Sequence, residues 1–172
     1  MASDTPDFVR AQGMPFLAHL LRRLADRMIS EAGQFYARKG VTAPARTAST
    51  LLLLREEGAQ SVTDLAARLR QSHPLAITWI RQLGKLGFVT QATDPSDRRR
   101  TLVDLTAAGR EEAERTRAAL EKLGRAYEQL LAEAGADLFE GLWRLDMITD
   151  DGALLRLLLR SADEAPDGAP FL

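Results

Sequence analysis

The chain lacks cysteine entirely and has only two histidines. The absence of cysteine from all 172 residues excludes disulfides, thiolate metal sites and thiol-based redox sensing. His19 and His73 fall on segments with different expected roles, so no metal site is predicted. Aromatic residues make up 6% of the sequence and hydrophobic residues 45%, which is typical of a helical protein packed with leucine and alanine. We expect no cofactor.

Long hydrophobic runs and catalytic motifs are also missing. The longest apolar runs, residues 51–54 and 157–159, fall far short of the ~20 residues that cross a bilayer. No secretory signal is visible, so we expect a cytoplasmic location and no membrane partner. There is no glycine-rich phosphate loop and no nucleophile motif, and the nearest carboxylate pair, Asp94 and Asp97, lies beside arginines in a predicted turn. The sequence does not predict an enzyme.

Charge is distributed unevenly along the chain, although the net charge is only −1. Residues 61–110 carry eight basic side chains against four acidic ones, whereas the rest of the chain carries 15 basic against 20 acidic. A basic segment within an acidic chain favours a protein that presents this segment to nucleic acid.

The N-terminal part of the chain predicts a flexible arm followed by a long helix. Residues 1–13 contain polar residues, proline and glycine. Residues 14–40 then carry an apolar stripe with helical spacing, which consists of Phe16, Leu17, Leu20, Leu21, Leu24, Met28, Ile29, Phe35 and Tyr36. We interpret this stripe as a dimerisation surface, with ordinary core packing as the alternative.

The C-terminal part predicts further dimerisation helices. Residues 107–160 are interpreted as two helices, over 107–131 and 137–160, and Gly152 is a potential break in the second. Their many large apolar side chains imply a partner surface. Residues 161–172 contain two prolines and three acidic residues and are expected to be disordered.

Capping residues predict shorter helices within the intervening region, residues 41–106. Thr42 is the expected N-cap of a core helix that ends near residue 57, with Pro44 in its first turn. A short strand fits residues 60–62. Thr63 is the expected N-cap of the helix that follows, and Leu105-Thr106 is expected to open the helix at residue 107.

The helix predicted over residues 73–86 has two contrasting faces. Ser72 is its expected N-cap and Gly87 its expected left-handed end. The face expected to pack on the preceding helices comprises Ala76, Trp79, Ile80, Leu83 and Leu86. The opposite face contains no acidic residue and comprises Pro74, Ile77, Thr78, Arg81 and Lys85. A structural helix ordinarily exposes glutamate as well as lysine, so this face favours DNA reading over a plain solvent face. Thr78 and Arg81 could reach base edges or phosphates, and Ile77 a thymine methyl group.

A β-hairpin is predicted next, with strands over residues 88–92 and 100–105. Three arginines follow the turn between the strands. A charge run is usually a solvated loop, but an arginine at a hairpin tip beside a recognition helix can enter the minor groove, where A·T-rich sequence is narrow and most negative. Asp97 is expected to hold an arginine side chain by a charge-assisted hydrogen bond.

The hairpin sequence resembles that of a known family. DPSDRR at residues 94–99 and LTAAG at 105–109 are similar to the DPxDRR and LTxxG signature of the MarR family of bacterial transcription regulators. The resemblance extends to VTDLA at 62–66 and LGKLGFV at 83–89. QSHP at 71–74 is similar to a subgroup whose recognition helix begins with these residues.

The resemblance implies a mainly α-helical winged helix-turn-helix protein with a small β-hairpin wing and N- and C-terminal dimerisation helices. It also implies a homodimer that binds double-stranded DNA at a pseudo-palindromic operator, usually as a repressor. The DNA-binding positions carried over are Pro74, Ile77, Thr78, Arg81, Asp97, Arg98 and Arg99. We also expect Ser72, His73, Lys85 and Arg100 to belong to the DNA-binding surface. Pro74 and Ile77 stand where the family usually has small polar residues.

A small aromatic or phenolic effector is a further implication of the resemblance. Where relatives place their ligand, this chain has Phe16, His19, Leu20 and Leu52. From the residues alone, a histidine in the position of His19 is more often a core or interface residue than a ligand-binding group. The alternative function is a winged-helix module for protein–protein interaction, without sequence-specific DNA binding.

Overall fold

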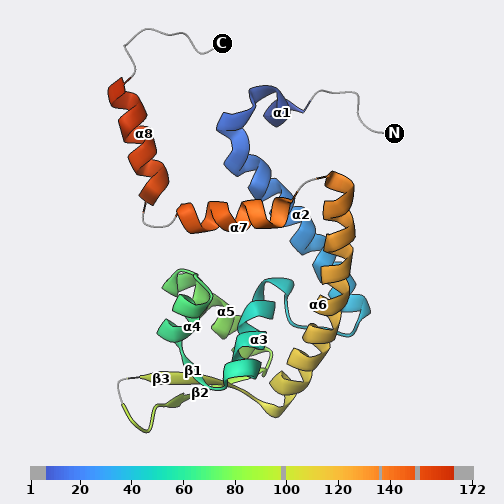
Figure 1. Ribbon diagram of the computed structural model, residues 1–172. Coiled ribbons are helices and arrows are strands. Elements are labelled where there is room, and N and C mark those ends of the chain that lie inside the picture. Colours follow the sequence, from blue (N-terminus) through green and yellow to red (C-terminus); the bar gives the residue numbers. More distant parts are fainter. Residues whose placement is uncertain (1–6, 98–99, 136, 150–151, 165–172) are drawn as a thin grey trace. The chain divides into compact units, whose positions relative to one another are not determined.

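The computed structural model describes residues 7–97, 100–135, 137–149 and 152–164. The chain divides into two compact units, residues 1–123 and 124–172, and Figure 1 labels the elements of each. The first unit contains α1 (Phe8–Gln12), the 3₁₀ helix η1 (Met14–Phe16), α2 (Leu17–Arg38), the 3₁₀ helix η2 (Ala45–Thr47), α3 (Ala48–Glu57), β1 (Gln60–Ser61), α4 (Val62–Arg68), α5 (His73–Lys85), β2 (Val89–Thr93), β3 (Thr101–Leu105) and the start of α6 (Ala107–Ala134). The second contains the end of α6, α7 (Leu138–Ile148) and α8 (Ala153–Glu164).

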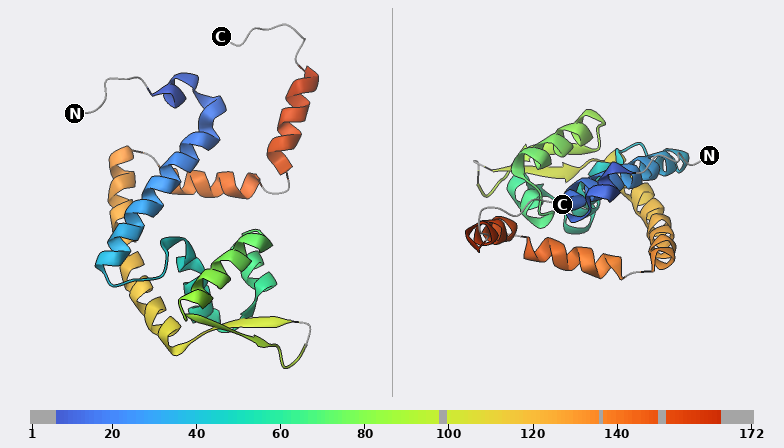
Figure 2. Two further views of the ribbon diagram at one scale, coloured as in Figure 1. Left: turned by 180° about the vertical axis from the view of Figure 1, so that it is seen from behind. Right: turned by 90° about the horizontal axis from the view of Figure 1, so that it is seen from above.

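The sheet of the first unit is antiparallel, with strand order β1-β3-β2. β2 pairs with β3 from Val89↔Leu105 to Thr93↔Thr101, which confirms the predicted hairpin. Helices α3, α4 and α5 lie over this sheet (Figure 1), and the hairpin projects past them in the views of Figure 2. The mainly helical winged helix-turn-helix fold is therefore confirmed.

The core of the first unit is formed by apolar side chains from the helices and from β3. The most deeply buried are Leu51, Leu54, Leu65, Leu83, Val103 and Leu105, each at most 2% exposed. Burying each of these side chains contributes roughly 2 kcal/mol to folding. This core fixes α3, α4 and α5 on the sheet and leaves the remaining face of α5 outside it.

Helix α1 was not expected, because residues 1–13 were interpreted as a flexible arm. Asp7 caps this helix by accepting hydrogen bonds from the backbone N–H groups of Val9 and Arg10 at 2.9 and 3.2 Å. The ring of Phe8 lies 5.7 Å from that of Phe16 in an edge-to-face contact. The cap and the aromatic contact together stabilise a helix that is too short to form on its own.

Two predicted helix starts are wrong. The Thr42 N–H and hydroxyl both donate to Glu112 Oε1, at 2.5 and 3.1 Å, so Thr42 lies in a loop and α3 begins only at Ala48. The N-cap of α4 is Ser61 and not Thr63, because Ser61 Oγ accepts from the N–H of Asp64 at 3.1 Å. A tertiary contact with Glu112 decided the first case, and a local capping hydrogen bond decided the second.

The predicted opening of α6 is confirmed and its LTAAG sequence has a physical explanation. The Thr106 hydroxyl accepts from Gly109 N at 3.0 Å and donates to the carbonyl of Gly87 at 2.6 Å. The backbone of α6 also approaches Phe88 so closely that a Cβ on Gly109 would lie 1.9 Å from the Phe88 carbonyl oxygen. Thr106 and Gly109 thus join α6 to the segment that connects α5 with the wing.

The second unit presents many apolar side chains to solvent. The segment predicted as one helix over 137–160 forms two: α7 ends at Ile148, and α8 begins at Ala153, directly after Gly152 with its φ of 73°. Helix α8 extends to residue 164, beyond the start of the expected disordered tail. The exposed apolar side chains include Phe139, Leu142, Trp143, Met147, Ile148, Leu154, Leu155, Leu157, Leu158 and Leu159. Residues 165–172 lie outside the described part of the chain. None of the described helices is both long and apolar enough to cross a membrane.

Candidate nucleic-acid interface

Helix α5 presents to solvent the face that the sequence assigned to DNA. All five residues of that face are exposed, namely Pro74, Ile77, Thr78, Arg81 and Lys85. On the opposite face Ala76, Ile80 and Leu83 are buried and Trp79 is half-buried. The prediction that Leu86 is buried is wrong: its side chain is 44% exposed, because α5 ends at Lys85 and Leu86 is the cap that precedes the left-handed Gly87.

The polar groups on this face are available to a ligand. The Thr78 hydroxyl donates to the Pro74 carbonyl at 2.9 Å, which leaves its oxygen free to accept a hydrogen bond. Arg81 and Lys85 form no ion pair within the described part of the chain. Ser72 and His73 are exposed at the start of α5, and Ser72 is in the N-cap position although its side chain makes no capping hydrogen bond. The exposed face is therefore basic at its centre and C-terminal end.

The turn of the wing is organised by Asp94. Its carboxylate accepts from the N–H and the hydroxyl of Ser96 at 2.7 and 2.6 Å, and these hydrogen bonds lower the pKa of Asp94. The Asp94 N–H donates to the carbonyl of Arg100 at 2.9 Å, and the Arg100 N–H donates to the carbonyl of Asp97 at 2.8 Å. The described ends of the loop are thus closed by backbone hydrogen bonds.

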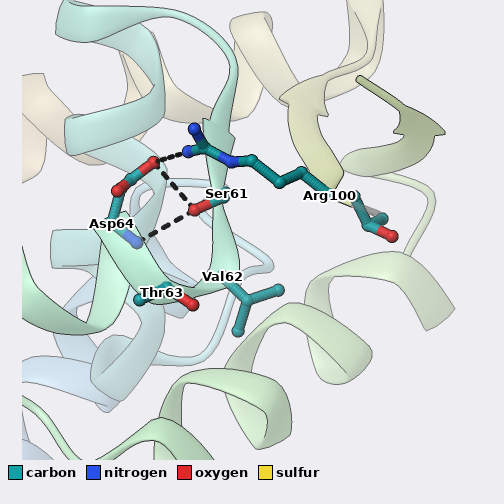
Figure 3. A pocket seen from close by; sticks show the side chains of 6 residues that line it. Ser61, Val62, Thr63, Asp64 and Arg100 are labelled. Atoms are coloured by element: carbon teal, nitrogen blue, oxygen red, sulfur yellow. Dashed lines mark hydrogen bonds and ion pairs between the residues drawn. The ribbon is translucent and has the colours of Figure 1, made fainter. Parts of the chain in front are cut away.

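An ion pair joins the wing to α4. Arg100 Nη2 lies 2.5 Å from Asp64 Oδ2, and Ser61 Oγ donates to the same carboxylate oxygen at 2.7 Å. Figure 3 shows the three side chains turned toward one another. They line a cavity of about 390 Å³. The functional predictions missed Ser61 and Asp64. The spacing of serine and aspartate three residues apart, which is that of a capping box, could have identified them.

Two predicted DNA contacts, Arg98 and Arg99, lie outside the described residues. The predicted role of Asp97 in holding an arginine side chain stays a prediction. Arg100, which was assigned to DNA, is instead paired with Asp64 in this structure.

The predicted effector residues are only partly brought together. Phe16 and Leu20 line an apolar cavity of about 290 Å³ between α1 and the start of α2. The ring of His19 lies 6.2 Å from that of Phe16. Leu52 is on α3 and does not line this cavity. Among the residues that the structure describes, no group of three histidine or carboxylate side chains could hold a metal ion.

Comparison with known proteins assigns the family. Residues 45–101, which run from the start of η2 to the first residue of β3, match the sequence profile of the MarR family. This part of the chain belongs to the MarR family. The members of this family are DNA-binding transcription regulators, and it is not a family of enzymes. The subgroup suggested by QSHP at residues 71–74 stays a prediction.

Solved MarR-family structures share the fold. MepR of Staphylococcus aureus, in a complex with DNA, is 20% identical, with 76% of this chain and 93% of MepR covered at a TM-score of 0.58. BpsR of Bordetella bronchiseptica, a protein whose DNA binding is regulated by 6-hydroxynicotinic acid, is 25% identical, with 87% and 94% covered at a TM-score of 0.55. The apo form of MarR from Escherichia coli is 18% identical, with 85% and 95% covered at a TM-score of 0.52. A search of curated proteins found no match.

Proposed function

We propose that this MarR-family regulator is a repressor that binds a pseudo-palindromic operator as a homodimer. The observation that carries the proposal is the exposed, acid-free face of α5, with Thr78, Arg81 and Lys85. In this arrangement α5 enters the major groove, where Thr78 and Arg81 contact base edges or phosphates, and Ile77 contacts a thymine methyl group. The wing reaches the adjacent minor groove, where arginine is favoured.

The proposed dimer is supported by apolar surface on the flanking helices. In α7 and α8 large side chains such as Phe139, Trp143 and Leu158 are more than half exposed, and in α2 Leu20 and Leu24 are about 40% exposed. Apolar surface of this extent marks a contact with another protein. A second copy of the chain would cover it and place two α5 helices on one operator.

Selection of bound sites from random duplexes tests the proposal directly. The expected result is an enriched inverted repeat whose half-sites are about one helical turn, or roughly 10 base pairs, apart. Retention of duplexes without any enriched sequence would favour the alternative function, a winged-helix module for protein interaction.

The wing arginines have a separate expected effect. Replacing Arg98 or Arg99 with alanine should weaken operator binding by about tenfold or more, because each substitution removes a positive charge from the minor-groove element. Fluorescence anisotropy with a labelled duplex measures this change. The slope of log affinity against log salt concentration should also become shallower by about 0.9 for each phosphate that the variant no longer neutralises. Arg117→Ala on the exposed surface of α6 is the control. Equal affinities of the wing variants and the control would contradict the wing assignment.

We further propose that an aromatic acid binds beside Phe16, His19 and Leu20 and releases the DNA. A suitable probe is 6-hydroxynicotinic acid, the compound that regulates DNA binding by BpsR. We expect it to bind in a calorimetric titration and to weaken operator binding, and we expect His19→Ala to reduce both effects severalfold. His73→Ala, which changes the other histidine, should leave ligand affinity unchanged. Unaltered ligand binding by the His19 variant would contradict this pocket.

A further inference from the structure

The third strand of the wing, β1, ends before the tip of the β2–β3 hairpin. β1 pairs with β3 only as far as Ser61↔Leu102, whereas β2 and β3 stay paired as far as Thr93↔Thr101. Beyond Leu102 the wing is therefore two-stranded, and a two-stranded hairpin is marginally stable in water at best. Contacts at this boundary decide how firmly the end of the wing is held.

Arg100 makes two kinds of contact at this boundary. Its backbone closes the loop through the hydrogen bonds with Asp94 and Asp97, at 2.9 and 2.8 Å. Its guanidinium donates to Asp64 Oδ2 at 2.5 Å, and Asp64 belongs to the first turn of α4. A single residue thus joins the loop of the wing to the helix-turn-helix (Figure 3).

Asp64 is itself held in a defined position. Ser61, which is only 5% exposed, donates to the Asp64 carboxylate and accepts from its N–H. Ser61 is both the last residue of β1 and the N-cap of α4. Much of the entropic cost of a surface ion pair comes from ordering two long side chains. Here one partner is short and already ordered, so less entropy is lost when Arg100 binds it.

We propose that Asp64 and Arg100 are positioning residues that orient the wing for the minor groove, and that Arg100 acts through Asp64 without contacting a DNA phosphate. This inference rests on the proposed DNA-binding function. The Asp64 carboxylate compensates the positive charge of the Arg100 guanidinium and would repel a nearby phosphate, so the net gain of this arginine from a phosphate is small. Holding the hairpin instead lowers the entropic cost of ordering the wing on DNA.

Operator affinity measured at several salt concentrations tests the pair in the full-length protein. Asp64→Asn and Arg100→Ala should each weaken binding by about two- to fivefold. The double variant should be no weaker than the weaker single variant, because all three break the same interaction. The slope of log affinity against log salt should stay unchanged. If Arg100 bound a phosphate, Arg100→Ala would lower the slope by about 0.9 and Asp64→Asn would tighten binding. Either result would overturn the proposal.

A matched control separates positioning from the change in charge. Asp26 on α2 forms a comparably exposed ion pair with Arg46 on η2, at 3.0 Å. Asp26→Asn removes the same charge from a pair that does not involve the wing, so we expect it to leave operator affinity within twofold of the wild type. A loss of affinity as large as that of Asp64→Asn would show that the effect is not specific to the wing, and would overturn the proposal.

Hydrogen exchange in the free protein gives a readout that does not need DNA. The Asp94 amide, which donates to the Arg100 carbonyl, should exchange several times faster in Asp64→Asn, whereas the buried Ile80 amide in α5 should not change. Unchanged exchange at Asp94 would overturn the positioning role whether or not the protein binds DNA. Faster exchange in a protein that selects no duplex would instead overturn the proposed function.

Discussion

Replacing Gly109 with alanine is expected to lower the free energy of unfolding by about 3 kcal/mol. The added Cβ would lie 1.9 Å from the carbonyl oxygen and 2.8 Å from the carbonyl carbon of Phe88. These neighbours are backbone atoms, so they cannot move aside as a flexible side chain would. The same carbonyl accepts the N–H of Thr106 at 3.0 Å, and a shift would weaken that bond too. Urea unfolding followed by circular dichroism measures the loss.

Gly124→Ala is the matched control for this prediction. Gly124 lies in the same helix, is exposed, and has no atom within 4 Å of the position of a Cβ. Alanine in a helix interior is more stable than glycine by about 0.5–1 kcal/mol, so this substitution should stabilise the protein slightly. If Gly109→Ala were equally harmless, the close approach of α6 to Phe88 would not exist in solution.

Replacing Glu112 with alanine is expected to cost a similar amount, about 3 kcal/mol. The Glu112 side chain is completely buried. Its Oε1 accepts from the N–H groups of Thr42 and Ala43 at 2.5 and 2.6 Å, and its Oε2 accepts from Arg115 at 2.8 Å. Alanine would leave two backbone donors in the loop between α2 and η2 without their acceptor. Glu121→Ala, which breaks an exposed pair with Arg117 on the same helix, should cost at most about 0.5 kcal/mol.

The stabilisation from Glu112 should also depend on pH. Burial raises the pKa of Glu112, but the hydrogen bonds from Ala43, Arg115 and Thr42 lower it by more, so the pKa lies below its usual value of 4.5. A carboxyl group whose pKa is lower in the folded state stabilises the fold above its unfolded pKa, and this stabilisation is lost as the pH falls through the folded pKa. The difference in unfolding free energy between the wild type and Glu112→Gln should therefore be constant near neutral pH and should shrink below pH 4.5. A difference that stays constant as the pH falls would contradict the lowered pKa.

Local sequence was sufficient to predict the helix-turn-helix and the wing. Contrasting faces at helical spacing predicted α5, and turn residues between two short apolar segments predicted the β2–β3 hairpin. Gly87 and Gly152 were identified as chain breaks because glycine readily adopts the left-handed conformation. These features depend on interactions between residues close in sequence, which is why the pattern alone was informative.

Other features were missed because a distant residue decides the local structure. Thr42 has the chemistry of an N-cap, but Glu112 lies 70 positions later in the sequence and takes up its N–H and hydroxyl. The pairing of Arg100 with Asp64, which is 36 positions away, was likewise not predicted. Neither contact can be predicted from the spacing of residues along the chain.

The amino-acid pattern thus specifies which segments become the reading helix and the wing, because helix faces, caps and turns are local properties. The tertiary structure decides which charges remain available for DNA. The fold brings Asp64 to Arg100 while Arg81 and Lys85 remain on the exposed face of α5. The physical reason is that an ion pair at 2.5 Å depends on where β3 and α4 pack, and that packing is set by the apolar core that both elements share.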